Sequence, residues 1–129
     1  MRITRATAYA IYALVYIAQQ KAESALASHQ IAQAYDIPER FLLKVLKPLV
    51  SAGLLLSIKG PRGGYRLARP ANQITLLEIV EAIEGPLRGQ TSFLGDGHDP
   101  LEKKLAQAFQ AATDEVRRKL TQVKLSHLL

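Results

Sequence analysis

One stretch of the chain, 38–67, constrains the fold more than any other, because a helix pattern in it runs directly into a hairpin pattern. Apolar residues recur there at the spacing of one helix face, and Gly53 stands where a helix commonly ends in a left-handed residue. Beyond it, apolar residues alternate with small or polar ones as in a strand, and the glycine and proline run at 60–64 is typical of a tight turn. The sequence therefore predicts a helix over 38–52 and a β-hairpin over 57–67.

The predicted helix and hairpin both carry positive charge on the parts that should face solvent. The apolar face of the helix is assigned to Phe41, Leu42, Val45, Leu46 and Leu49, and the opposite side to Arg40, Leu43, Lys44 and Lys47. Lys59 and Arg62 flank the turn of the hairpin. A basic helix beside a basic hairpin tip is what a winged helix presents to DNA. The alternative is an ordinary hairpin whose cations are simply solvated.

Charge and residue types narrow the possible functions further. Residues 1–70 hold ten Lys/Arg and three Asp/Glu, whereas residues 71–129 hold seven and eight, so a polyanionic partner is expected for the first part only. The chain has no cysteine, which excludes disulfides, thiolate-held metals and a cysteine nucleophile. His29, His98 and His127 lie far apart, and no nucleophile has a local base. We therefore expect no enzyme activity, no metal site and no cofactor.

The N-terminal part has the element order of a helix-turn-helix. Thr4 is expected to cap a helix that extends to about Gln20, and this helix is apolar nearly all round, so it should lie centrally in the core. A signal peptide is the alternative, but three tyrosines recur there at helix-face spacing, so we interpret the segment as a core helix of a cytoplasmic protein. Ser28 is expected to cap a short helix over 28–35, and a tight turn leads from it into the basic helix.

A further helix follows the hairpin. Thr75 and Glu78 form the pattern of a capping box, and the helix should end at Gly85. Three acids recur at a spacing of three residues on this helix, and they are Glu78, Glu81 and Glu84. Because no base or pocket is evident beside them, we interpret them as a solvated face.

A long helix is predicted from about 99 to 123, after a loop over 87–98. Its apolar stripe consists of Leu101, Leu105, Ala108, Phe109, Ala112, Val116, Leu120 and Val123. A stripe of this length is a candidate dimer seam, and the alternative is a helix packed back on its own domain. The overall prediction is a mainly α (α+β) fold. It has a winged helix-turn-helix domain at 1–86, and an effector loop with a dimerisation helix at 87–129, in one compact unit.

Four motifs of the chain occur together in one known family. They are Met1-Arg2-Ile3-Thr4-Arg5-Ala6-Thr7, Ile37-Pro38 with Phe41-Leu42 and Val45-Leu46, Lys59-Gly60-Pro61-Arg62-Gly63-Gly64-Tyr65, and Ile74-Thr75-Leu76 with Glu84-Gly85. In this combination the chain resembles the Rrf-two family of bacterial winged-helix transcription regulators. The resemblance implies a homodimer on a near-palindromic operator, with one helix of each subunit in the major groove and the wing tip in the minor groove. We expect a repressor.

The resemblance also implies roles for individual residues. Arg2 and Thr4 are expected to contact phosphates, Arg40, Leu43 and Lys44 to face the bases, and Lys59 and Arg62 to form the wing tip. We add Ser28 and Lys47 to this DNA-binding set. Leu43 donates no hydrogen bond, so it either contacts a thymine methyl or contributes nothing.

One departure from the family bears on regulation. Members that sense iron, iron–sulfur status or nitric oxide carry three cysteines in the loop before the long helix, and the loop 87–98 of this chain has none. A thiolate-held iron–sulfur cluster is therefore excluded, and we expect a small-molecule effector or a partner enzyme, recognised by Arg88, Phe93 and His98. Three alternatives stay open. The loop binds nothing, the winged helix binds protein and not DNA, or the chain is a haem or metal sensor that uses His98.

Overall fold

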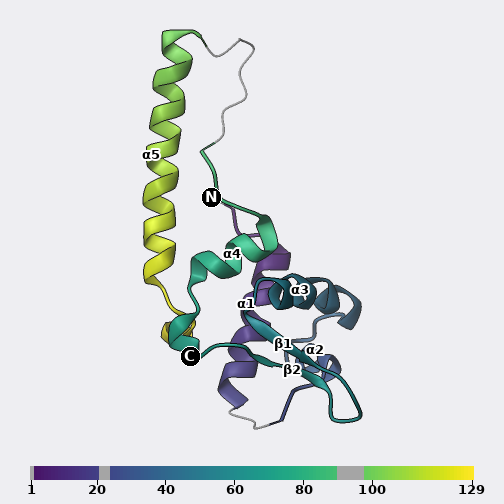
Figure 1. Ribbon diagram of the computed structural model, residues 1–129. Coiled ribbons are helices and arrows are strands. Elements are labelled where there is room, and N and C mark those ends of the chain that lie inside the picture. Colours follow the sequence, from purple (N-terminus) through teal and green to yellow (C-terminus); the bar gives the residue numbers. More distant parts are fainter. Residues whose placement is uncertain (1, 21–23, 90–97) are drawn as a thin grey trace.

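The computed structural model describes residues 2–20, 24–89 and 98–129, which form a winged-helix body with a long helix beside it (Figure 1). In chain order the elements are α1 (Arg5–Gln20), α2 (Ser28–Tyr35), α3 (Glu39–Ser51), β1 (Leu55–Ile58), β2 (Gly64–Leu67), η1 (Ala71–Gln73), α4 (Leu76–Glu84), α5 (Pro100–Gln122) and η2 (Leu125–Leu128). The two strands form an antiparallel hairpin. The predicted fold class is thus confirmed. None of the helices in the described ranges is long and apolar enough to cross a membrane.

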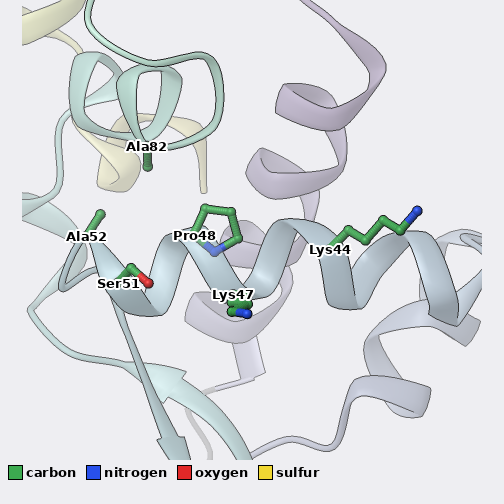
Figure 2. A pocket seen from close by; sticks show the side chains of 6 residues that line it. All are labelled: Lys44, Lys47, Pro48, Ser51, Ala52 and Ala82. Atoms are coloured by element: carbon green, nitrogen blue, oxygen red, sulfur yellow. The ribbon is translucent and has the colours of Figure 1, made fainter.

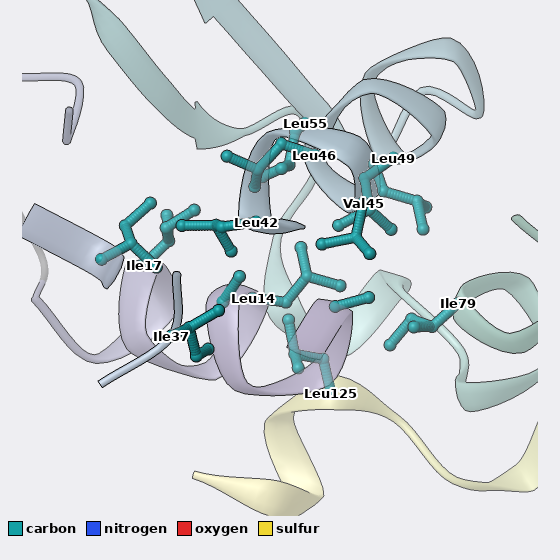
Figure 3. Close-up of a cluster of buried hydrophobic side chains, with 14 of the residues drawn as sticks. Leu14, Ile17, Ile37, Leu42, Val45, Leu46, Leu49, Leu55, Ile79 and Leu125 are labelled. Atoms are coloured by element: carbon teal, nitrogen blue, oxygen red, sulfur yellow. The ribbon is translucent and has the colours of Figure 1, made fainter. Parts of the chain in front are cut away.

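The hydrophobic core forms around α1, which contacts α2, α3, α4 and β2. Leu14 and Ile17 of α1 lie together with Leu42 and Leu46 of α3 in the centre of this core (Figure 3). Burying one such side chain contributes about 1.5–3 kcal/mol, so α1 and α3 hold each other in place. The prediction of a central first helix is confirmed, although Tyr12 is 51% exposed and the helix is therefore not buried all round.

A sharp turn joins α2 to α3. Asp36 adopts φ 52°, a left-handed conformation that aspartate tolerates better than most residues. The N–H of Ile37 donates to the carbonyl of Ala32 at 2.9 Å, which closes the end of α2. The carbonyl of Pro38 accepts from the N–H of Leu42 at 3.0 Å and so begins α3. The helix-turn-helix order predicted from the sequence is therefore present.

The start of α2 differs from the expectation. Its N-cap is Ala27, and Ser28 is already the first helical residue, so the prediction that Ser28 caps this helix is wrong. Alanine has no side-chain acceptor, and the turn is closed instead by Gln30, whose Oε1 accepts from the N–H of Ala27 at 2.8 Å. The Ser28 hydroxyl donates to Oε1 of Glu39 at 2.8 Å and thereby joins α2 to α3.

The chain passes from α3 into the wing through a glycine-terminated helix end. Gly53 has φ 77°, as expected of a residue that ends a helix in the left-handed region. The N–H of Leu54 then donates to the carbonyl of Leu49 at 3.0 Å, and β1 begins one residue later. Because this turn is short and hydrogen-bonded, the wing starts at a defined point relative to α3.

The base of the wing is held by the segment that precedes α2. Leu26 and Tyr65 exchange two backbone hydrogen bonds, with distances from nitrogen to oxygen of 2.9 and 2.8 Å. A Cβ atom on Gly64 would lie 2.3 Å from the carbonyl oxygen of Leu26. Only glycine therefore fits at position 64 without a shift of the backbone.

The fourth helix, α4, begins and ends with the signals expected of it, and α5 begins with an aspartate cap. Thr75 and Glu78 form the predicted capping box, and α4 ends before Gly85, which has φ 85°. Asp99 caps α5, since its Oδ1 accepts from the N–H of Leu101 at 2.7 Å. In Figure 1, α5 runs beside α4 and projects far beyond it.

The C-terminal segment returns to the winged-helix body. The N–H of Leu125 donates to the carbonyl of Ile74, and the N–H of Leu76 to the carbonyl of Val123, each at 2.8 Å. Leu125 is completely buried and belongs to the same core as α1. Residues after position 86 thus contribute to the core of the first part. The division into two domains at 86–87 stays a prediction.

Candidate nucleic-acid interface

The side of α3 that points away from the core carries three cations. Arg40, Lys44 and Lys47 are exposed, and Leu43 between them is 42% exposed. In the described ranges none of these three cations forms an ion pair with a carboxylate. Their positive charge is therefore uncompensated and available to an external anion.

Phe41 does not belong to the buried face, and that part of the sequence assignment is wrong. Its side chain is 41% exposed, whereas Leu42 and Leu46 are fully buried. The guanidinium carbon of Arg40 lies 5.1 Å, and the ammonium nitrogen of Lys44 5.6 Å, from the centre of the Phe41 ring. Both distances suit cation–π attraction, so this ring helps to hold the two cations on the surface of α3.

The wing presents charge and apolar surface together. Lys59 and Arg62 are exposed at its tip. Leu56 and Ile58 of β1 are also 42% and 38% exposed. A Cβ atom on Gly63 would lie 2.4 Å from the carbonyl oxygen of Ile58, so the tip closes without room for a side chain there.

Two hydroxyls of the predicted DNA-binding set, those of Thr4 and Ser28, already donate to carboxylates of the chain. The hydroxyl of Thr4 donates to Glu84, and that of Ser28 donates to Glu39. Each hydroxyl has one proton, so a DNA phosphate would have to replace the carboxylate to receive it. Arg2 is exposed, and its guanidinium can donate to a phosphate without first giving up a carboxylate among the described residues.

The three acids of α4 do not form a solvated face, and that interpretation is wrong. Each carboxylate joins α4 to a different element: Glu78 pairs with Arg69, Glu81 with Arg117, and Glu84 accepts from the hydroxyls of Thr4 and Thr7. α4 is thus fastened to the segment after the wing, to α5 and to the start of α1. Spacing along one helix could not reveal this, because the partners lie on other elements.

The electrostatics of two of these acids follow from their partners. Burial alone would raise the pKa of Glu78, but hydrogen bonds from Arg69 and Thr75 outweigh it and lower the pKa below the ordinary value. The hydroxyls of Thr4 and Thr7 lower the pKa of Glu84. Both carboxylates are therefore ionised at neutral pH, which keeps the contacts of α4 intact.

Glu81 lies at the junction of α4, α5 and the segment between them. It pairs with Arg117 of α5, and it accepts from the N–H of Leu87 at 2.8 Å. Arg117 also donates to the carbonyl of Leu87 at 3.3 Å. A Cβ atom on Gly89 would lie 2.7 Å from Cα of Gln110, so the chain after α4 runs close against α5. The sequence placed the effector loop between these two helices but did not reveal the pair of Glu81 and Arg117 that joins them.

The apolar stripe of α5 is mostly uncovered. Leu101 is 62% and Phe109 50% exposed, whereas only Leu120, near the C-terminal end of the helix, is buried. Leu105 and Val116 are half-buried, and Ala112 is exposed. The last turns of α5 therefore pack back on the domain, whereas Leu101 and Phe109 stay largely open to solvent.

The predicted effector residues are only partly described. Arg88 and His98 are exposed, and Phe93 lies outside the described residues. Leu87 and Arg88 line a small pocket of about 270 Å³ against Phe109, Thr113 and Val116 of α5. The structure thus brings Arg88, but not His98, to this pocket on the long helix.

A shallow basic hollow of about 550 Å³ lies between α3 and α4 (Figure 2). Lys44 and Lys47 line it together with Ser51, Pro48 and Ala82. The two lysines extend the positive surface of α3 toward α4. The sequence indicated the lysines but not the hollow, because Ala82 comes from a separate helix.

The arrangement of a basic helix and a hairpin wing is shared with a known family. Over residues 3–129 the chain matches the family described as Rrf2, iron-dependent transcriptional regulator. The chain belongs to the Rrf2 family. The resemblance to the Rrf-two family that the motifs indicated is thus confirmed. The fold is similar to that of CymR (YrzC), the global cysteine regulator of B. subtilis, with a TM-score of 0.79 and 28% identity over 99% of this chain and 95% of that one.

Other relatives support this assignment at different coverage. CymR of Bacillus subtilis (strain 168), named as an HTH-type transcriptional regulator, is 30% identical over 116 residues, which are 90% of this chain and 83% of CymR. Protein aau3 of Rhizobium meliloti (strain 1021) is 44% identical over 84 residues, which are 65% of this chain and 54% of aau3. The chain therefore spans about half the length of aau3. Rrf2 relatives are transcriptional regulators, in agreement with the prediction that the chain is not an enzyme.

Iron appears in the description of the Rrf2 family, but the residues of this chain do not fit a thiolate-held cluster, because the chain has no cysteine. Within the described ranges, no group of three or more His, Asp or Glu side chains is arranged to hold a metal ion. A haem or metal sensor that uses His98 stays an untested alternative. The residues that the structure describes, together with the absence of cysteine, give an iron-based mechanism no support.

Proposed function

We propose that this Rrf2-family chain is a DNA-binding transcription regulator that acts as a homodimer and a repressor on a near-palindromic operator. The observation that carries the proposal is that Arg40, Lys44 and Lys47 lie exposed on the outer side of α3 and pair with no carboxylate of the described residues. In this proposal α3 enters the major groove and the wing tip the minor groove. A regulator works where its DNA lies, so a cytoplasmic location follows from the same proposal.

Individual residues have different tasks in this interface. Arg40 and Lys44 face the bases with Leu43, and Arg2, Thr4, Ser28 and Lys47 contact phosphates, while Lys59 and Arg62 reach the minor groove. Phosphate contacts position the protein, and base contacts select the sequence. The Phe41 ring supports selection by holding Arg40 and Lys44 near one place on α3.

The homodimer is proposed to form through α5. Leu101 and Phe109 are apolar and exposed to solvent, and a second α5 related by a two-fold axis would bury them. Such a dimer sets the two copies of α3 about 34 Å apart, which is one turn of DNA. Repression then follows if the operator overlaps a promoter.

Regulation is proposed to act through the segment between α4 and α5. Glu81, Arg117 and Leu87 join the two helices there, and Arg88 lines a pocket on α5 beside them. A small molecule or partner protein that prefers one arrangement of this junction would shift DNA affinity. The alternative is a junction without an effector.

A salt titration with random duplex DNA tests the central proposal. Affinity should fall linearly in a log–log plot, because each neutralised phosphate releases counterions. Arg2→Ala combined with Lys47→Ala should reduce the slope by about 2, since each of these two cations is proposed to contact one phosphate. Lys103→Ala on α5 is the matched control and should leave the slope unchanged.

A winged helix that binds protein is the second candidate, because Leu56 and Ile58 on the wing are exposed and apolar. The same titration separates the two candidates. If duplex DNA does not bind even at low salt, or if the two substitutions leave its affinity unchanged, the DNA interface is refuted and the protein-binding candidate remains.

A further inference from the structure

An open pocket of about 350 Å³ lies where the first turn of α1 meets the first half of α3. Tyr9, Phe41 and Pro38 supply much of its wall, and two cations, Arg5 and Lys44, complete it. Pockets of this size with apolar walls and a few polar groups are typical of small-ligand sites. None of the roles described so far uses this pocket.

The charges of the pocket are one-sided. No acid lines it, and neither Arg5 nor Lys44 forms an ion pair with a carboxylate in the part of the chain that the structure describes. Lys44 is 5.6 Å from the centre of the Phe41 ring, so its ammonium lies beside a flat apolar surface. A ligand that complements both features has one negative charge and a flat apolar body.

We propose that this pocket binds a small aromatic carboxylate, and that the bound carboxylate lowers the affinity of the chain for DNA. The carboxylate group pairs with Arg5 and Lys44, and the aromatic body packs on Phe41 and Tyr9. The second half rests on the proposed function, in which Lys44 faces DNA. The ammonium of Lys44 cannot pair fully with the ligand carboxylate and with DNA at the same time, so the two compete. Each therefore lowers the affinity of the chain for the other.

The pocket is tested first without DNA, by titrating the purified chain with 2-naphthoate and following amide and methyl NMR shifts. We expect saturable shifts at residues around the pocket. The neutral 2-naphthamide should bind more weakly, because it lacks the charge, and inorganic phosphate should bind more weakly, because it lacks the apolar body. Equal binding of naphthoate and naphthamide, or no saturation by naphthoate at millimolar concentration, overturns the proposal.

Substitutions then locate the site. Arg5→Gln and Lys44→Gln should each weaken naphthoate binding about threefold, the loss expected for a largely exposed ion pair. Lys47→Gln is the matched control, since Lys47 lies on the same helix but does not line this pocket, and it should leave naphthoate affinity unchanged. An equal loss in all three variants would mean attraction to general positive charge and would overturn the site.

The effect on DNA is measured separately, so that the two proposals can fail independently. Saturating naphthoate should weaken duplex binding by the parent chain, and less so by Lys44→Gln. If naphthoate binds the pocket but DNA affinity does not change, the regulatory half is wrong. If the chain binds no DNA even without naphthoate, the proposed function fails while the NMR titration still decides the pocket. If Arg5→Gln weakens DNA binding and naphthoate does not bind, the pocket holds a DNA sugar-phosphate instead, and the proposal is overturned.

Discussion

Gly64 is the position where one added methyl group should do the greatest damage to the wing. In Gly64→Ala the new Cβ atom would lie 2.3 Å from the carbonyl oxygen of Leu26 and 2.8 Å from the backbone nitrogen of Ala27. These are backbone atoms and cannot rotate away. The two hydrogen bonds that Leu26 exchanges with Tyr65 must therefore lengthen or break, and the base of the wing separates from the segment before α2.

The expected cost follows from those contacts. Two backbone hydrogen bonds contribute about 1 kcal/mol each to the free energy of unfolding. A side chain at φ 148° adds about 1 kcal/mol of backbone strain. Gly64→Ala should therefore lower the free energy of unfolding by about 3 kcal/mol. Gly60→Ala is the matched control, because Gly60 has φ 110° but no atom within 4 Å of the added Cβ, so about 1 kcal/mol of strain remains alone.

Urea unfolding followed by circular dichroism measures both variants. Protein concentration must be equal in all samples, since a dimer gains stability with concentration. Unchanged m-values would show that the same surface is exposed on unfolding. If Gly64→Ala loses no more stability than Gly60→Ala, the contact between the wing base and Leu26 does not stabilise the fold, and the reasoning is refuted.

Four further predictions concern the interface, the dimer, the core and pH. Lys44→Ala should lower operator affinity by about 1–3 kcal/mol if it contacts a base, and equal affinity for parent and variant would exclude that contact. Leu105→Glu should give a monomer in sedimentation, and a monomeric parent at micromolar concentration would contradict the dimer. Leu125→Ala should cost about 2–5 kcal/mol in urea unfolding, because the side chain is fully buried. The fold lowers the pKa of Glu84, so its ionised carboxylate adds to the free energy of unfolding above the ordinary pKa of 4.5. This stabilisation is lost as the pH falls through the folded pKa. In Glu84→Gln the free energy of unfolding should therefore fall less on acidification than in the parent.

Much of the local structure could be predicted from short-range signals in the sequence. The left-handed end of α3 at Gly53 and the capping box at Thr75 are both present as expected. Each depends on bonds within a few residues, so the residues that make the contact stand close together in the sequence. The cations of α3 and the wing tip were found in the same way, because helix and strand periods assign them to the outer side.

The errors share one physical cause. Sequence periodicity predicts on which face of its own helix a side chain lies, but not which other element packs against that face. Phe41 was assigned to the apolar face of the helix and is 41% exposed, because the core partners of α3 reach Leu42 and Leu46 but not its ring. Glu81 was interpreted as solvated, and its partner Arg117 lies 36 residues later in the chain.

The sequence by itself therefore determined the elements, their order, the winged-helix class and the position of the positive charge. Only the tertiary structure decided which charges stay unpaired. It joins the acids of α4 to Arg69, Arg117 and the first turn of α1. Beside one apolar pocket, Lys44 and Arg5 have no carboxylate partner among the residues that the structure describes. The reason is that pairing depends on distances between elements far apart in the chain, and these distances are set by the packing of the core.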